Sequence, residues 1–418
     1  MGPNYALISN VLNRARAEIA RCVASAKIES GEWTIDSVTV DGASAGQIRS
    51  RKACPEAVTA FLALHAPPVY DPFCGGGSIP LEAQRLGLRA FASDLNPVAV
   101  LITKALIEIP PKFAGMPPVN LGSRRQQTKH ADQLGVRGLA EDVRYYGRWM
   151  RDEAQKRIGH LYPKVAVTPG LALHRPDLTP DVGQELMVVA WLWARTVASP
   201  NPATNGAHVP LVRSFWLCTK QGRKAWVEPL IDRVTNKYHF EIRVGTPDEV
   251  LDISIQGGTK LGRGCKFRCI LTDQPIPEAY IKSESVAGRL GDRLLAVVAE
   301  GSKGRVYLSP TFEQESVVAE AVASDQIRGL DAPLAHDLRN LWCLQYGLDH
   351  FHKLFTRRQL LTLTTFSDLV AEARVKVASD ATGQISNPDE YAEAVATYLL
   401  LSAHLVLDIS ELPPRSHY

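Results

Sequence analysis

Residues 69–97 read VYDPFCGGGSIPLEAQRLGLRAFASDLNP and carry the strongest indication of a fold in this chain. A short apolar segment ends at Asp71, three glycines follow at 75–77, and a second apolar segment ends just before Asp94. Residues 80–86 lie between the two segments and have the composition of a helix, which a glycine ends. The order strand, glycine loop, helix, strand and acid predicts half of a doubly wound α/β sheet.

The sequence on either side of this stretch predicts four regions. Residues 1–54 form a helical and irregular segment in which WTIDSVTV (33–40) alternates like a short strand. Residues 55–165 form a Rossmann-like, cofactor-binding region. Residues 190–300 are rich in alternating β patterns, and residues 301–418 are mainly helical. The predicted fold class is therefore α/β, with a Rossmann-like sheet, a β-rich insertion and a helical C-terminal region.

The composition is that of an ordinary globular protein. Of the 418 residues, 45% are hydrophobic and 22% are charged, and the net charge is +3. This charge permits a nucleic-acid partner without indicating one, because phosphate binding depends on local clusters. No apolar run reaches the roughly 18 residues of a membrane span, and seven scattered cysteines favour a reducing compartment. We therefore expect a cytoplasmic protein of several domains with no membrane association.

The glycine loop predicts a ligand that contains a nucleoside. Glycines after a first strand let a ligand approach the backbone, and the following helix adds unpaired N–H groups at its N-terminus. An acid at the end of the second strand, here Asp94, can accept both ribose hydroxyls. The alternative is a plain turn between strand and helix, which would need neither three glycines nor a correctly spaced acid.

The charge of the loop distinguishes between cofactors. The spacing is not GxGxxG, because the third position is Pro80, and the acidic Asp71 precedes the glycines. A carboxylate at this point would repel the pyrophosphate of a dinucleotide. It would attract the cationic sulfonium and ammonium groups of S-adenosylmethionine. The loop therefore favours S-adenosylmethionine as the cofactor.

Several blocks of the sequence resemble one family. The longest block is DPFCGGGSIPLEAQRLGLRAFASDLNPVAVLITKALIEIPPKF, and GLAEDVRYYGRWM and GRLGDRLLAVVAEGSKGRVYLSPT follow it in order. These blocks resemble a family of predicted bacterial adenine-specific DNA methyltransferases that carry a zinc-ribbon insertion. The resemblance extends from about residue 67 to about residue 401. The motif DPFCGG alone is less specific, since RNA methyltransferases that act on guanine or adenine carry a similar motif.

The resemblance implies a role for each residue of the cofactor segment. The first acid and the glycines would hold the methionine end of the cofactor, the second acid would bind the ribose, and Phe73 and Asn96 would line the pocket. The cofactor-binding residues implied in this way are Asp71, Pro72, Phe73, Gly75, Gly76, Gly77, Asp94 and Asn96. The parent reaction is N6-methylation of an adenine that is flipped out of DNA, so DNA is the expected partner.

The catalytic loop that this reaction needs is not found in the sequence. In a D/N/S-P-P-aromatic loop, the polar residue and a proline carbonyl accept the hydrogens of the adenine amine, and the aromatic ring stacks on the base. All four Pro-Pro pairs of the chain lack both ends of this motif, and SPTF at 309–312 lacks the second proline. We therefore assign no catalytic residue. We expect an incomplete sheet in a chain that ends before the catalytic loop, with a companion subunit as the possible source of that loop.

Two other functions stay open. The chain could be a non-catalytic subunit that binds DNA or a protein partner and keeps the cofactor fold as a scaffold. It could also be an RNA base methyltransferase, on the strength of the less specific loop motif.

The zinc ribbon of this family has lost most of its ligands here. A closed tetrahedral zinc site needs four soft ligands such as thiolates. Ser199 and Thr204 stand near the first expected cysteine pair, and Thr272 replaces the partner of Cys269 in the second pair. Serine and threonine hydroxyls are not deprotonated at neutral pH. We therefore expect a metal-free β module in which Cys265 and Cys269 are the remaining candidates for zinc ligands.

Some other residues have structural as well as functional interpretations. Phe215, Trp216 and Trp226 are expected to pack together in the β module. Asp142 could reach the cofactor, although acids in the first turn of a helix are a normal capping preference. Three basic groups could touch phosphates but are each typical of a solvated face: 124–125, 220–224 and 357–358.

Overall fold

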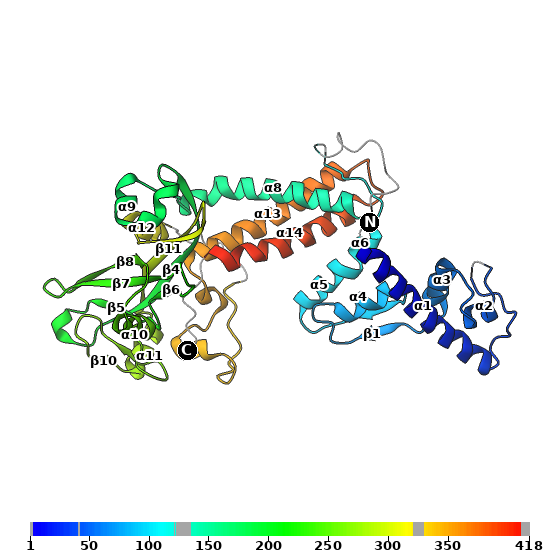
Figure 1. Ribbon diagram of the computed structural model, residues 1–418, viewed down its shortest axis with the longest axis horizontal. Coiled ribbons are helices and arrows are strands. Elements are labelled where there is room, and N and C mark those ends of the chain that lie inside the picture. The colour runs from blue at the N-terminus through cyan, green and yellow to red at the C-terminus, as the bar shows by residue number, and fades with distance from the viewer. Residues whose placement is uncertain (1–2, 41, 121, 123–134, 321–329, 411–418) are drawn as a thin grey trace. The chain divides into compact units, whose positions relative to one another are not determined.

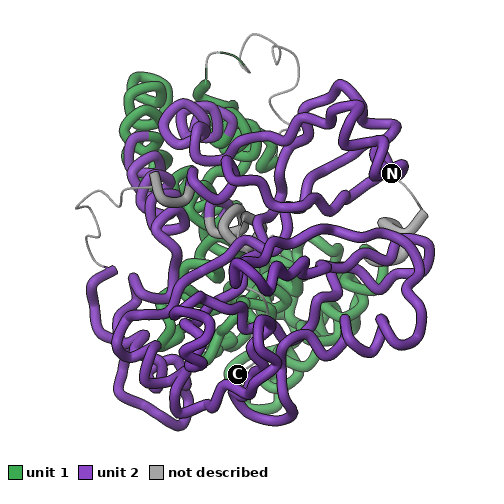
Figure 2. The backbone as a smooth tube through the Cα atoms, turned by 90° about the vertical axis from the view of Figure 1, so that its left-hand side faces the viewer, with its two compact units in different colours: residues 1–147, 373–401 green, residues 148–372, 402–418 purple. Residues whose placement is uncertain are grey.

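The structure is a computed structural model that describes residues 3–40, 42–120, 122, 135–320 and 330–410 (Figure 1). The chain forms two compact units, each built from two separate stretches of sequence (Figure 2). Unit 1 comprises residues 1–147 and 373–401, and unit 2 comprises residues 148–372 and 402–418. These units differ from the four regions expected from the sequence, since the C-terminal region contributes to both of them.

Unit 1 is mainly helical and contains the predicted cofactor segment. Its elements begin with α1 (Pro3–Glu29), α2 (Ala45–Arg49), α3 (Pro55–His65), β1 (Val69–Asp71), α4 (Ser78–Arg85), β2 (Ala90–Ala92), α5 (Pro97–Ile107) and α6 (Ile109–Lys112). Parts of three longer helices complete it: α8 (Arg137–Ile158), α13 (Arg357–Ala381) and α14 (Pro388–Ser410). Within the described residues, every helix is too short or too polar to cross a membrane.

The cofactor segment forms the β-α-β unit that its pattern predicts. β1 and β2 pair in parallel, with Tyr70 opposite Phe91, and α4 packs against both strands. Both aromatic side chains are more than half exposed, at 63% and 57%, although a doubly wound sheet normally has helices on both faces. Within the described residues this parallel sheet has two strands. The mixed α/β class is confirmed, whereas the described residues do not form a complete Rossmann-like sheet.

The first three helices of unit 1 share a small core. Ala20 and Ala24 lie one turn apart on α1 and are fully buried, so α3 can approach closely and place Phe61 and Leu62 between the helices. Trp33 packs against the same core, with its ring centroid 5.9 Å from that of Phe61. The strand predicted at 33–40 is wrong, because this segment forms a single bridge, Val38 to Ser44, instead of a ladder. Packing of Trp33 against helices outweighs the local alternation.

The buried carboxylate of Asp142 joins α8 to α14. It accepts hydrogen bonds from Val119 N at 2.8 Å and from Asn120 N at 3.0 Å and Nδ2 at 2.7 Å. The hydroxyl of Tyr391 in α14 donates a fourth bond at 2.6 Å. Burial, followed by the charge of Asp142, raises the pKa of Tyr391. The cofactor role considered for Asp142 is therefore replaced by a structural one, since its oxygens are occupied by protein donors.

Unit 2 contains all the described antiparallel sheets. Its strands are β3 (Val165–Ala166), β4 (Glu185–Ala198), β5 (His208–Pro210), β6 (Trp216–Cys218), β7 (Ala225–Asp232), β8 (Lys237–Val244), β9 (Phe267–Arg268), β10 (Pro275–Ile276), β11 (Gly291–Gly301) and β12 (Gly304–Leu308). Its short helices are α9 (Pro169–His174), α10 (Glu249–Gly257), α11 (Glu278–Val286) and α12 (Phe312–Glu320). Five 3₁₀ turns are described: Gly159–Leu161, Pro176–Asp181, Pro202–Thr204, Trp342–Tyr346 and Phe351–Leu354.

Pairing between β4 and β11 closes the β-rich region. The strand order is β12-β11-β4-β3, with β5 also paired to β4, and a second sheet has the order β6-β7-β8. The β4–β11 register runs from Thr196 opposite Gly291 to Met187 opposite Glu300, so the two ends of the region lie beside each other. β7 and β8 form an antiparallel hairpin within the region whose β patterns alternate.

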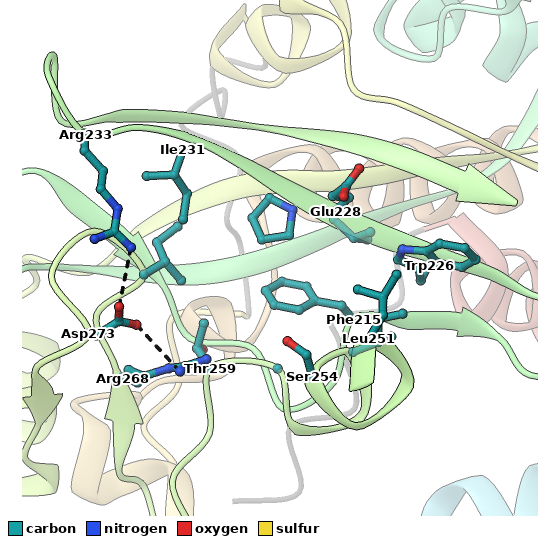
Figure 3. Close-up of a pocket in the computed structure, with 15 residues that line it drawn as sticks. Phe215, Trp226, Glu228, Ile231, Arg233, Leu251, Ser254, Thr259, Arg268 and Asp273 are labelled. Carbon is teal, nitrogen blue, oxygen red and sulfur yellow. Dashed lines mark hydrogen bonds and ion pairs between the residues drawn. The ribbon is translucent and has the colours of Figure 1, made fainter. Parts of the chain in front are cut away.

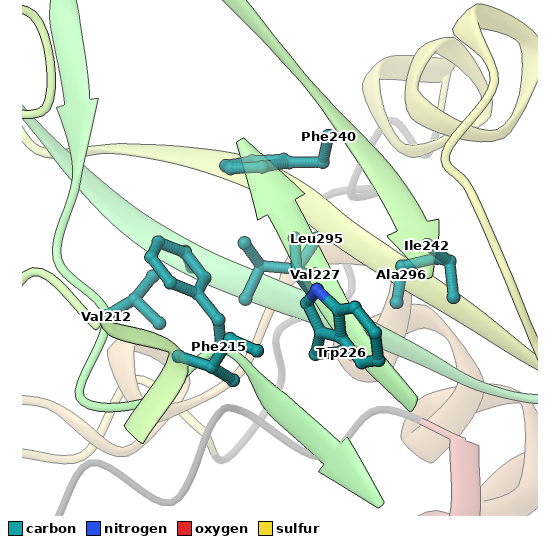
Figure 4. Close-up of a cluster of buried hydrophobic side chains, with 10 residues drawn as sticks. Val212, Phe215, Trp226, Val227, Phe240, Ile242, Leu295 and Ala296 are labelled. Carbon is teal, nitrogen blue, oxygen red and sulfur yellow. The ribbon is translucent and has the colours of Figure 1, made fainter. Parts of the chain in front are cut away.

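The two larger sheets of unit 2 share the apolar core shown in Figure 4. Phe215 and Trp226 are buried in it, and Trp216 packs against it. The rings of Trp216 and Trp226 meet edge to face, with centroids 5.8 Å apart. The predicted aromatic packing of the β module is therefore confirmed.

In the basic group at 357–358, Arg357 is exposed as expected, whereas Arg358 is not. Arg358 is fully buried, and its Nη1 donates to the carbonyl oxygen of Leu161 at 3.0 Å. Its guanidinium lies 4.3 Å from the ring centroid of Trp191 and 5.0 Å from that of Tyr162, within the range of cation–π attraction. It therefore holds the start of α13 in unit 2. The group at 124–125 lies outside the described residues.

Candidate functional site

The predicted cofactor residues of unit 1 meet at the carboxyl ends of β1 and β2. Asp71 ends β1, and Asp94 follows β2 by two residues. Ser93 N donates to Asp71 O at 3.0 Å, and Cys74 N donates to Ser93 O at 3.0 Å. These bonds hold the two strand ends side by side, which is the position at which open α/β sheets bind ligands.

Asp94 is fastened to the glycine loop through its side chain. Its Oδ2 accepts Gly75 N at 2.9 Å, and its Oδ1 accepts Asn96 N at 2.8 Å. These N–H groups lower the pKa of the Asp94 carboxyl, and that of Asn96 has the larger effect. The group is therefore ionised at neutral pH, and a carboxylate has about four acceptor sites, so it can also take hydroxyl donors from a ligand.

The residues before the glycines form a tight turn. Asp71 is 8% exposed, and its Oδ1 accepts Phe73 N at 3.1 Å. Pro72, between them, is exposed. The turn therefore keeps the Asp71 carboxylate at the base of the loop.

The three glycines serve different purposes. Gly75 has a φ of +48°, and Gly77 has a φ of +76°. A Cβ on Gly75 or Gly76 would meet nothing within 4 Å, whereas a Cβ on Gly77 would lie 2.9 Å from Thr103 Oγ1. Gly77 is thus required by packing against α5, and Gly75 by its backbone conformation. Gly76 has neither constraint, so the open space beside it is where a ligand could lie against the backbone.

The rim of the loop carries apolar side chains. Phe73 is 81% exposed, and Leu95, directly after the acid, is 96% exposed. Asn96 lies on the same segment, where its Oδ1 caps α5 by accepting Val98 N at 3.0 Å. Leu95 is absent from the residues predicted above, and its position next to Asp94 is the signal that identifies it. Two exposed apolar groups beside two carboxylates suit a ligand with a flat apolar part and a polar, cationic part.

The remnant zinc segments do meet in unit 2, but their side chains form no ligand set among the described residues. Ser199 Oγ lies 3.4 Å from Cys269 Sγ, and both residues are buried. Thr204 Oγ1 donates instead to Asn201 O at 2.7 Å. Burial raises the pKa of the Cys265 thiol, which disfavours the thiolate that zinc needs. The part of the chain that the structure describes contains no group of three His, Cys, Asp or Glu side chains placed to hold a metal ion.

A cavity of about 190 Å³ lies in unit 2 between β7, α10 and the segment 268–273 (Figure 3). Phe215, Trp226 and Leu251 supply apolar walls, and Arg233 and Arg268 line it with Asp273. The indole Nε1 of Trp226 is buried and has no hydrogen-bond partner among the described residues. None of the predicted cofactor residues lines this cavity.

Comparison of the chain with protein-family models, with curated proteins and with solved structures found no match.

Proposed function

We propose that this chain binds S-adenosylmethionine at the loop between β1 and α4, and that it serves the methylation of adenine N6 in DNA. The observation that carries the proposal is the bond from Gly75 N to Asp94 Oδ2, at the border of a bare glycine loop. The adenine and the DNA come from the sequence resemblance alone. The proposed role of the chain's own residues is to bind and orient the methyl donor, and no residue is assigned to the methyl transfer itself.

Charge favours this cofactor over a dinucleotide. Asp71 and Asp94 border the same loop, and the Asp94 carboxyl has a lowered pKa. A cation beside these carboxylates is attracted, and an anion is repelled. Because a pyrophosphate is anionic and a sulfonium is cationic, the electrostatic interaction with these carboxylates favours the methyl donor.

Isothermal titration calorimetry with S-adenosylmethionine and S-adenosylhomocysteine tests the cofactor. We expect both to bind, and we expect Asp94→Ala to weaken both by at least about tenfold, because the ribose acceptor is removed. S-adenosylhomocysteine lacks the sulfonium, so Asp71→Asn should weaken the binding of S-adenosylmethionine more than that of S-adenosylhomocysteine. Asp152→Asn, an exposed carboxylate on α8, is the matched control. No heat with either ligand would reject the cofactor proposal.

A second candidate is a non-catalytic subunit that completes its sheet with a companion polypeptide. The exposed pair of Tyr70 and Phe91 and the two-stranded parallel sheet favour it. Parallel sheets are normally covered on both faces and contain more strands. The absence of a D/N/S-P-P-aromatic sequence from the chain supports the same candidate.

A tritiated-methyl assay separates the two candidates. The chain is assayed alone and with a companion polypeptide that carries a D/N/S-P-P-aromatic loop. Incorporation by the chain alone would reject the scaffold function. Duplex DNA and a structured RNA, offered in competition as methyl acceptors, distinguish DNA from RNA methylation.

A further inference from the structure

A basic hairpin lies in unit 2 at residues 259–268, TKLGRGCKFR, which contain no acidic residue. Leu261 N donates to Lys266 O at 2.8 Å, and Arg268 N donates to Thr259 O at 2.6 Å, so the segment closes on itself. The glycines at 262 and 264 have φ values of +65° and +78°. This left-handed backbone makes the tight turn that presents the exposed Arg263 at its tip.

The base of the hairpin is anchored in the core. Cys265, Phe267 and Cys269 are 5%, 8% and 1% exposed and belong to one apolar cluster. Since side chains alternate along an extended segment, Lys266 and Arg268 project to the opposite side. Lys266 and Arg268 therefore stand on a backbone whose neighbouring side chains are buried.

The four cations of residues 259–268 are incompletely paired with carboxylates. Asp273 lies 3.6 Å from Arg268 Nη1 and 3.5 Å from Arg233 Nη2, so two guanidinium groups share one carboxylate (Figure 3). A further acid, Glu278 on α11, accepts Cys265 N at 3.3 Å and pairs with Lys282 at 2.7 Å. In the described part of the chain, three cations of the hairpin have no carboxylate within 4.0 Å: Lys260, Arg263 and Lys266.

We infer that this hairpin, together with Arg233, is a binding surface for the phosphodiester backbone of a nucleic acid. Unpaired Lys and Arg side chains on one rigid turn are the groups that contact phosphates and release their counterions. The inference rests on the proposed function only in the choice of nucleic acid as the partner. The cofactor loop lies in unit 1, so the two proposals can fail separately.

Fluorescence anisotropy with a labelled 20-base-pair DNA duplex and the full chain tests the surface. We expect Arg263→Ala/Lys266→Ala to weaken binding about tenfold in low salt and to reduce the slope of log K against log salt by about 2, because two phosphates would no longer be neutralised. The matched control is Lys303→Ala/Arg305→Ala, which removes the same charge from the turn of β11 and β12. A single strand and an RNA hairpin of equal length show which nucleic acid supplies the phosphates.

Each outcome decides the inference. The inference is supported if only the hairpin variant loses affinity for DNA. Its melting temperature and its heats of binding for S-adenosylhomocysteine should then be unchanged. Equal losses in the hairpin and control variants would show a mere dependence on net charge and would overturn it. Absence of binding to all three nucleic acids in low salt would overturn it as well. Binding that persists while calorimetry finds no cofactor would reject the cofactor proposal and leave this surface standing.

Discussion

The carboxylate of Asp94 accepts the backbone N–H of Gly75 at 2.9 Å and so joins residues that are 19 positions apart in the sequence. The bond ties the segment after β2 to the loop after β1. The acid and the glycine loop are therefore one structural unit, and a change in either should alter both ligand binding and the order of the loop.

Alanine substitutions should separate the roles of two neighbouring glycines. Gly77→Ala places a Cβ 2.9 Å from Thr103 Oγ1 in a backbone with positive φ, so we expect a loss of about 2 kcal/mol in the free energy of unfolding. Gly76→Ala meets nothing within 4 Å and should leave stability unchanged while weakening cofactor binding. Urea denaturation and calorimetry measure the two effects. Equal stability losses in both variants would contradict this assignment.

The pH dependence of Asp94 follows from its backbone donors. Because the N–H groups of Asn96 and Gly75 lower its folded-state pKa, its contribution to stability is complete above the ordinary value of 3.8. That contribution is lost as the pH falls through the lower folded-state pKa. An NMR titration of the carboxyl carbon should therefore give a midpoint below 3.8, and the urea-unfolded chain provides the reference. A folded-state midpoint at or above the reference would show that the bonds from Gly75 N and Asn96 N to Asp94 do not form in solution.

Removing the buried carboxylate of Asp142 should lower the stability of unit 1. Asp142→Ala leaves the N–H groups of Val119 and Asn120 and the hydroxyl of Tyr391 without their acceptor, so we expect a loss of roughly 3 kcal/mol in the free energy of unfolding. Tyr391→Phe removes one of the donors and should cost about 1 kcal/mol. Asp152→Ala, on the same helix but exposed, should change stability little. Chemical denaturation of the three variants measures these differences.

The open edge of β1 should be visible in hydrogen exchange. Val69 N donates to Arg89 O at 2.9 Å, and Ser93 N donates to Asp71 O at 3.0 Å, so in a parallel ladder the N–H of Tyr70 points away from β2. We expect Tyr70 to exchange faster than Val69 and Asp71 in the isolated chain. A companion that adds a strand to β1 should slow Tyr70 selectively. Slow exchange of Tyr70 in the isolated chain would argue against an open edge.

Thiol labelling and chelation test the interpretation of the β module as metal-free. Cys22 and Cys54 are exposed, whereas Cys265 and Cys269 are buried, and burial raises the pKa of Cys265. A thiol reagent should therefore modify the exposed pair first and reach the buried pair only on unfolding. Removal of a structural zinc ion would lower the melting temperature, because such an ion contributes directly to folding. We expect a metal-free module, so EDTA should not change the melting temperature. A drop in melting temperature on chelation would reveal a metal site.

Sequence patterns were sufficient to predict the elements whose cause is local. The glycines, the spacing to Asp94 and the flanking apolar segments were sufficient to predict β1, α4 and β2, because turns and strand ends depend on a few consecutive residues. The helical pattern of residues 301–418 likewise predicted α13 and α14. The alternating patterns of residues 190–300 likewise predicted strands such as β7 and β8.

Contacts between residues far apart in the sequence became known from the folded chain. Trp33 packs in a helical core although its local pattern predicts a strand. Arg358 contacts the rings of Trp191 and Tyr162 although its sequence predicts a surface position. The sharing of Asp273 by Arg233 and Arg268 joins segments that no periodicity links. Burial energy and charge pairing depend on what surrounds a side chain in space, and a sequence pattern reports only on its neighbours along the chain.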